Sequence, residues 1–408
     1  MLRTLPLVFV LAGVVLYVAL AGADFGAGLW LLLSGRGERG TRIREHAHRS
    51  MAPVWEANHV WLIFVLTVTW TAYPSFFGSV ASTLGAALLL AALGIVLRGA
   101  SYALRAGTDG RRGRWAIDSA FAIASLVAPF ALGAAAGAIA SERVPVGNAA
   151  GRLFASWLNP TSAAVGVLAV VFAAYLAAVY LAADAARLGD AELETAFQRR
   201  ALVTGALAGA VALGTLAVLR GDARSLYDEL LRGGALATMV LSGVAGVGTL
   251  GLVRARRFGV ARLTAALAVA AVITGWALAR YPTLLPGLSV EQAAASHDTL
   301  VTLIVAVVAG GVLLFPSLGL LFGMLLSGRF DTGGLPANAP ARARALPAGS
   351  RIGAGRGAVA LLLAGVGLLN VAGAPWAHGI GVTALLAAVV LGFASIVPAV
   401  LAEDPPRG

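Results

Sequence analysis

Long apolar segments, separated by short polar ones, occupy most of the chain. A helix needs about 20 predominantly apolar residues to cross the hydrocarbon core of a bilayer. Eleven segments meet this requirement, at residues 5–33, 54–77, 79–104, 115–140, 161–187, 201–219, 234–253, 262–281, 298–326, 356–374 and 377–401. The pattern therefore predicts an all-α fold, a polytopic bundle of membrane-spanning helices.

One stretch near the C-terminus breaks this pattern. Residues 327–355 are rich in Gly, Ala, Pro and Arg and show no hydrophobic periodicity, which indicates a flexible cytoplasmic linker. The sequence is accordingly divided into a main transmembrane domain at 1–326, the linker, and an additional pair of transmembrane helices at 356–402.

Composition supports a membrane protein and excludes several other classes. Of the 408 residues, 59% are hydrophobic and only 12% are charged, whereas soluble domains carry about 25% charged residues. The absence of cysteine excludes disulfides, thiolate metal sites and cysteine nucleophiles. The net charge of +11 comes from arginines in short loops, so we interpret it as topological and do not expect nucleic acid as a partner.

The arginines are distributed unevenly between two sets of loops. Twenty-two of the 30 lie at 34–50, 105–114, 187–200, 254–262 and 327–356 or in the C-terminal tail, and seven lie in the other set. Cytoplasmic loops of membrane proteins carry the excess of basic residues. We therefore expect a multi-pass protein of a bacterial cell membrane, with its N-terminus outside and its C-terminus in the cytoplasm.

Asp24 lies inside the first apolar segment, where a charged carboxylate costs about 2.5–3.5 kcal/mol on insertion scales. On a helix it shares one narrow stripe with Gly13, Tyr17, Ala21 and Gly28. Small residues in such a stripe allow a neighbouring helix to approach closely. The stripe is therefore expected to bury Asp24 against protein, away from lipid.

Two further groups in the membrane are Glu56 and His59, which share a helix face near the start of the second span. Arg98, in the third span, is either a counter-charge for one of the acids or a side chain that reaches the nearby cytoplasmic surface. Carboxylate and imidazole groups at partial depth are what a proton relay requires. Two readings stay open: a proton pathway through these residues and Asp24, or a buried hydrogen-bonded cluster that only orients helices.

The histidines argue against a haem held by this chain alone. His46 and His48 lie in a basic loop and are expected to be solvated, while His297 and His378 lie at the starts of spans. Only His59 is clearly inside the membrane, and it has no histidine partner at its depth. Bis-histidine ligation needs two imidazoles that face one pocket.

Two motifs carry a resemblance to a known family. Gly22-Ala23-Asp24-Phe25-Gly26-Ala27-Gly28 resembles the Asp-Gly-Phe-Asp-x-Gly-x-Gly stretch in the first helix of cytochrome bd quinol oxidase subunit II. The earlier acid of that stretch is Ala21 here. Gly26 and Gly28 match its glycines.

The second motif is the more specific one. Residues 52–63 resemble the family's Ala-Pro-x-Trp-Asp-Gly-Asn-x-x-Trp-Leu signature. The matching residues are Pro53, Trp55, Glu56, Asn58 and Trp61, where Glu56 is longer by one methylene than the family's aspartate. The resemblance covers roughly residues 1–326 and includes Arg98, at the end of the third span; it does not cover the two last spans.

The resemblance implies about nine family-like spans and a haem-free subunit II of a quinol:dioxygen oxidoreductase in the respiratory chain. Haems b and d and the quinol site are then expected mainly in a haem-bearing partner, subunit I, and oxygen is reduced to water with protons taken from the cytoplasm. This chain would stabilise the partner and contribute the proton pathway. Further implied partners are membrane lipid, a structural quinone or lipid, and a small accessory subunit. The alternatives are a stand-alone proton-coupled transporter and a purely structural scaffold.

Overall fold

The computed structural model of the protein describes residues 1–35, 37–51, 55–105, 111–326, 356–365, 368 and 375–400. The chain divides into two compact units, Met1–Phe315 and Pro316–Gly408, and each is described by itself. The predicted linker at 327–355 and Pro53 lie outside the described residues. The division into domains at residue 326 stays a prediction from the sequence.

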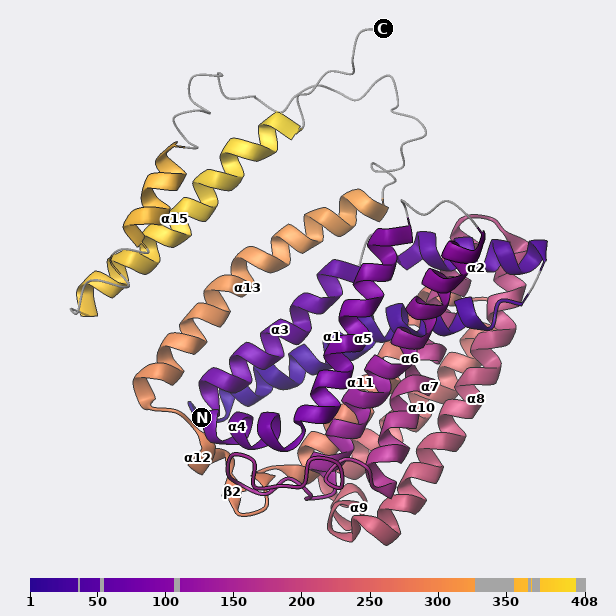
Figure 1. Ribbon diagram of the computed structural model, residues 1–408, viewed down its shortest axis with the longest axis horizontal. Coiled ribbons are helices and arrows are strands. Elements are labelled where there is room, and N and C mark those ends of the chain that lie inside the picture. Colours follow the sequence, from indigo (N-terminus) through magenta and orange to yellow (C-terminus); the bar gives the residue numbers. More distant parts are fainter. Residues whose placement is uncertain are drawn as a thin grey trace, which may run out of the picture. The chain divides into compact units, whose positions relative to one another are not determined.

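Long helices build the first unit (Figure 1). They are α1 (Leu5–Leu32), α3 (Trp55–Ala72), α5 (Gly85–Arg105), α6 (Arg111–Ala140), α7 (Pro160–Arg187), α8 (Ala191–Asp222), α10 (Gly233–Arg254), α11 (Phe258–Arg280) and the first part of α13 (His297–Leu326). Among the described residues, eight helices are long and apolar enough to cross a membrane, namely all of these except α3. The predicted polytopic all-α membrane fold is thereby confirmed.

The second predicted span, 54–77, differs from the structure at its end. Helix α3 stops at Ala72 and its apolar part, Asn58–Ala72, is shorter than the other candidate spans. Pro74 begins a separate helix, α4 (Pro74–Thr83). A proline disfavours helical backbone in the residue before it, and Tyr73 indeed leaves the helix, with φ −136° and ψ 65°.

Several short elements lie where we expected loops. They are α2 (Glu38–Met51), α9 (Arg224–Leu230), the antiparallel strands β1 (Thr283–Leu285) and β2 (Leu288–Ser289), and α12 (Val290–Ala293). The most important of them is α2. Most of its residues are polar or charged, but Ile43 and Ala47 form a narrow buried stripe on one face. This stripe packs into the same core as α1 and α7.

Glycines hold α1 close to three neighbouring helices, α3, α6 and α7. A Cβ atom on Gly26 would lie 1.9 Å from the backbone oxygen of Ala173 in α7, and one on Gly28 would lie 2.2 Å from Oγ of Ser125 in α6. On the same stripe as Gly28, Gly13 meets α3, with Val65 at 2.7 Å from the position of such a Cβ. The predicted close approach at the small-residue stripe is therefore confirmed.

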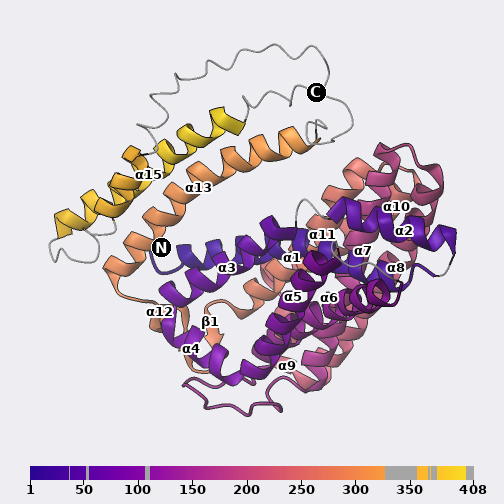
Figure 2. The same cartoon turned by 45° about the horizontal axis from the view of Figure 1, so that its top comes forward.

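Ion pairs join the basic segments at one end of the first unit, the end that carries α2 in Figures 1 and 2. Arg42 of α2 pairs with Asp190 at 2.6 Å and also with Glu192, and Arg256 pairs with Glu194 at 2.8 Å. The backbone amide of Leu193 and the Arg42 guanidinium lower the pKa of the Asp190 carboxyl. The arginine distribution predicted that these loops lie on the same side of the membrane. In the structure they meet at one end of the first unit.

The opposite end carries the remaining loops and α9. Arg143 pairs with Asp222 at 2.5 Å, and Asp222 also accepts a hydrogen bond from the hydroxyl of Thr161 at the start of α7. Arg280 pairs with Glu142 at 2.5 Å. These contacts connect the ends of α6, α7, α8 and α11.

In the second unit, the helical segment Arg356–Gly365 lies against α15 (Pro375–Val400). A Cβ on Gly365 would lie 2.7 Å from the side chain of Leu385 and 2.8 Å from the backbone oxygen of Gly381. The two helices therefore approach closely at glycines, and their apolar parts, Arg356–Gly365 and Gly379–Ala388, are shorter than the candidate spans of the first unit. The pair of spans at 356–402 stays a prediction from the sequence.

The contact at Gly26 predicts that adding a single methyl group there strongly destabilises the fold. Gly26→Ala forces α1 away from the backbone of α7, and overpacking of this kind costs about 1–3 kcal/mol or more. Thermal unfolding of the detergent-solubilised protein should show a clear fall in midpoint. Gly22→Ala is the matched control, because its Cβ would meet only a flexible Leu176 methyl at 3.4 Å. Equal stability of the two variants would contradict this packing.

Candidate functional site

Asp24 and Arg98 form an ion pair inside the first unit. The two guanidinium ends, Nη1 and Nη2, each donate to one carboxylate oxygen at 2.5 Å. Asp24 is fully buried, and Arg98 is 3% exposed. Of the two readings for Arg98, the counter-charge is therefore the one that the structure shows.

Arg98 has partners besides the carboxylate. Its Nη2 also donates to the backbone oxygen of Asp24 at 3.0 Å, and its Nε donates to Oγ of Ser125 at 3.0 Å. The guanidinium carbon lies 5.0 Å from the ring centre of Phe25 and 4.7 Å from that of Phe121. Cations are attracted to aromatic faces at such distances, so the charge of Arg98 is satisfied on several sides.

Three helices position these groups. Asp24 comes from α1, Arg98 from α5, and Ser125 and Phe121 from α6. Because Gly28 has no side chain, Ser125 can lie directly against α1 one turn after Asp24. The Ser125 hydroxyl donates to the backbone oxygen of Phe121 at 2.7 Å, which leaves its lone pairs for Arg98. The glycine motif of the first helix thus places the acceptor that orients the arginine.

His59 belongs to a neighbouring group of rings. Its imidazole centre lies 6.1 Å from the ring of Tyr17 and 6.0 Å from that of Phe25, both in edge-on arrangements. Phe25 contacts the Arg98 guanidinium as well. The Tyr17 hydroxyl is buried without a hydrogen-bond partner among the described residues.

The other predicted motif residues have a mixed outcome. Asn58 and Trp61 are buried, at 3% and 9% exposure. The backbone of Trp55 and Glu56 lies in the first turn of α3, while the side chains of both lie outside what the structure describes. The predicted pathway role of Glu56 therefore rests on the sequence alone.

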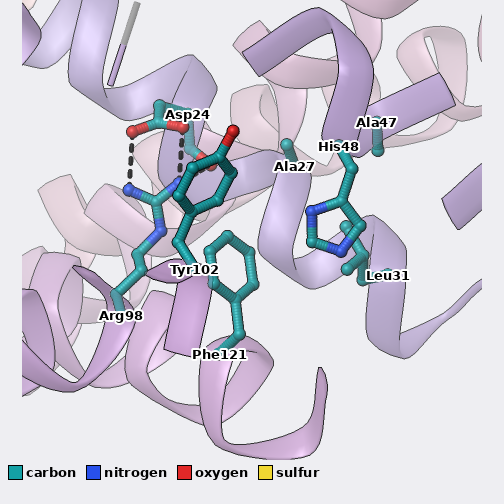
Figure 3. A pocket seen from close by; sticks show the side chains of 8 residues that line it. All are labelled: Asp24, Ala27, Leu31, Ala47, His48, Arg98, Tyr102 and Phe121. Atoms are coloured by element: carbon teal, nitrogen blue, oxygen red, sulfur yellow. Dashed lines mark hydrogen bonds and ion pairs between the residues drawn. The ribbon is translucent and has the colours of Figure 1, made fainter. Parts of the chain in front are cut away.

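A small cavity lies beside the ion pair, towards α2 (Figure 3). Its lining comes from α1, α2, α5 and α6, and consists of Asp24, Ala27, Leu31, Ala47, His48, Arg98, Tyr102 and Phe121. In Figure 3 the Tyr102 ring lies beside the ion pair, and His48 lies across the cavity from Arg98. Four residues with polar side chains thus line one space, whose wall is mostly apolar.

His46 and His48 correct our expectation of solvated loop histidines. His46 is 5% exposed and its Nε2 lies 3.0 Å from the backbone oxygen of Leu181. The side chain of His48 is 11% exposed and approaches Asp118 at 3.8 Å. The expectation was wrong because the segment folds as a helix against the bundle. The spacing of Ile43, His46 and Ala47 on one face was the available signal.

No group of three or more histidine, aspartate or glutamate side chains that could hold a metal ion occurs within the described ranges. The imidazoles of His46, His48 and His59 have other neighbours. His46 lies against Leu181 and Phe197, His48 against Asp118 and Phe121, and His59 against Tyr17 and Phe25. None of these surroundings supplies a second imidazole, so they do not fit a haem held between two histidines.

Comparisons with known proteins point in one direction. The family model for cytochrome bd terminal oxidase subunit II matches residues 2–325. Subunit 2 of the cytochrome bd-I ubiquinol oxidase of Escherichia coli strain K12 is 28% identical over 211 residues, which is 48% of this chain and 53% of that protein. Subunit 2 of the Bacillus subtilis cytochrome bd ubiquinol oxidase is 27% identical over 114 residues, or 28% and 33% of the two chains.

A solved structure adds to these similarities. One chain of the bd oxidase from Geobacillus thermodenitrificans aligns with 80% of this chain and 99% of its own length, with 27% identity and a TM-score of 0.60. The sequence alignments are shorter, and span only about a third to a half of the curated relatives.

The forked geometry of the ion pair predicts that lysine cannot replace Arg98. Arg98→Lys keeps the charge, but it loses the paired hydrogen bonds and the contact with Ser125. We expect a loss of roughly 2–4 kcal/mol in stability, measured as a lower thermal midpoint of the purified protein.

The control is Arg200→Lys. Arg200 also stacks on aromatic rings, those of Trp30 and Phe197, but it has no carboxylate partner among the described residues. Arg200→Lys should therefore lower the stability far less than Arg98→Lys. A similar loss in both variants would show that aromatic stacking, and not the ion pair, holds Arg98.

Proposed function

The chain belongs to the family of cytochrome bd terminal oxidase subunit II, and from this we propose that it acts as the haem-free subunit of a membrane-bound quinol oxidase. Its partner is a haem-bearing subunit I that carries haems b and d, oxidises quinol and reduces oxygen to water. The observation that carries the proposal is the match of the family model to residues 2–325. The relatives named above are all oxidases or oxidase subunits, which favours this function over a transporter.

The surroundings of the histidines support a haem-free role. A haem supplies the electron transfer and oxygen chemistry when it is bound, and we assign that chemistry to the partner. This chain contributes packed helices and a fixed pair of charges. Binding of a structural quinone or lipid and of a small accessory subunit stays a prediction from the sequence.

We further propose that the end of the bundle with α2 faces the cytoplasm. Basic loops belong on that side, and Arg42, Arg256 and their acidic partners gather there. Arg3, near the N-terminus, lies at the other end, where its backbone oxygen accepts a hydrogen bond from Tyr73. This orientation puts the N-terminus outside.

The proposed contribution to catalysis is a proton pathway through Asp24, Glu56, His59 and Arg98. Protonation of a buried acid that is bound to arginine normally costs free energy, because it leaves the arginine as an unpaired buried charge. Here Arg98 keeps Ser125, the backbone oxygen of Asp24 and two aromatic faces when the carboxylate is neutral. These remaining partners reduce the cost of an Arg98 guanidinium left without its carboxylate.

Purification from native membranes tests the assignment as an oxidase subunit. A tagged chain should bring down a haem-bearing protein, and the complex should consume oxygen with quinol. The separated chain should show no haem absorption. Isolation of the chain as a haem-free protein that catalyses proton-coupled uptake would contradict the proposal.

Replacement of the buried acid tests the pathway. Asp24→Asn mimics the neutral carboxyl, so the complex should assemble with its haems but turn over at least tenfold more slowly. Asp184→Asn is the control, because Asp184 also loses an arginine partner, Arg262 at 2.5 Å, but lies outside the pathway. Turnover within twofold of wild type for Asp24→Asn would rule out a proton-carrying role for this acid.

A further inference from the structure

We propose that protons enter towards Asp24 through His48 and Asp118, and that a single water molecule in the cavity of Figure 3 connects His48 with Asp24. This inference rests on the proposed proton role of Asp24 and extends it to residues that the sequence motifs do not include. It assigns His48 as the proton-accepting group at the α2 end of the cavity.

The volume of the cavity matches a single water molecule. It offers about 10 Å³, and a cavity needs about 10–15 Å³ and two to four polar partners to hold one water. Asp24, Arg98, His48 and Tyr102 are among the residues that line it, while most of its wall is apolar. A quinone or a lipid chain is far too large for this space.

His48 has the chemistry and the position of an entry group. Histidine is the side chain whose unperturbed pKa lies closest to neutral pH. The side chain retains 11% exposure, whereas Asp24 has none. The titratable and charged groups that face it are Asp118 of α6, at 3.8 Å, and across the cavity Asp24 of α1 and Arg98 and Tyr102 of α5. Asp118 stabilises the imidazolium that forms when His48 accepts a proton.

The transfer is balanced in protons and moves no electrons. His48 takes a proton from the cytoplasmic solvent and passes it to the cavity water, which gives one of its own protons to the Asp24 carboxylate. The water and the neutral imidazole are restored, and Asp24 becomes the neutral acid. Arg98 stays bound to Ser125 and to the backbone oxygen of Asp24 meanwhile.

Two phenyl rings flank the ion pair. Phe25 contacts the guanidinium of Arg98 and the imidazole of His59, and Phe121 contacts the guanidinium of Arg98 and the imidazole of His48. The two sides differ in the cavity, which lies on the side of His48 and is lined by polar residues of α1, α2 and α5.

The test compares two histidines of one helix, the partly exposed His48 and the buried His46, in the complete oxidase complex. His48→Gln keeps a polar side chain of similar length but cannot titrate, and His46→Gln is its matched control, because His46 faces Leu181 and Phe197. Proton uptake from the cytoplasmic side is followed with a pH-sensitive dye after an oxygen pulse to the reduced complex in vesicles. We expect uptake to slow at least tenfold in His48→Gln with haem content intact, and to stay within twofold in His46→Gln.

If the His48→Gln complex does not assemble, a second variant tests the proposed entry route. Ala47→Val adds apolar volume to the cavity wall without changing a titratable group, and it should also slow proton uptake severalfold. Wild-type uptake in His48→Gln or, in its place, Ala47→Val overturns the entry route. If Asp24→Asn remains slow in that case, protons reach Asp24 by another way and the proposed proton role of Asp24 stands. If Asp24→Asn is also unaffected, the proposed proton role of Asp24 fails as well, while the assignment as an oxidase subunit is tested separately by the purification above.

Discussion

The burial of two opposite charges inside a membrane-spanning bundle is the constraint on which this structure depends. Either Asp24 or Arg98 alone would be costly in an apolar interior, and the cost falls only when both meet in a suitable geometry. The two lie on different helices, and each of the two guanidinium ends meets one carboxylate oxygen at 2.5 Å. The packing of α1, α5 and α6 therefore depends on this ion pair.

Small residues make that geometry possible, and they also determine what lies around it. Gly26 and Gly28 bring the backbone of α1 against α7 and α6, so that Ser125 reaches Arg98. The helix α2 closes the same region from the end of the bundle and leaves a water-sized cavity beside the charges. Fixed charges beside a narrow space are features that the proposed proton route requires, and here they follow from helix packing.

Much of this arrangement could be predicted from the sequence, because lipid imposes simple rules on length, charge and small residues. Eight of the eleven predicted apolar spans, the burial of Asp24 and the stripe at Gly13 and Gly28 followed from periodicity. The choice between the two readings of Arg98 did not, since its position near a helix end allows either. The helix α2 was missed because its composition is that of a solvated loop, and the cavity at His48 was missed with it. The spacing of Ile43, His46 and Ala47 indicates one apolar face, but only the tertiary fold shows what this face packs against.

The most direct test of the central claim is a double-mutant cycle between Asp24 and Arg98, measured as unfolding free energies of the purified protein. The variants are Asp24→Asn, Arg98→Gln and the two together. The account predicts that each single change is costly and that the double variant is less destabilised than the sum, by a coupling of about 1–3 kcal/mol. Strict additivity of the two changes would contradict the claim that this ion pair holds the helices together.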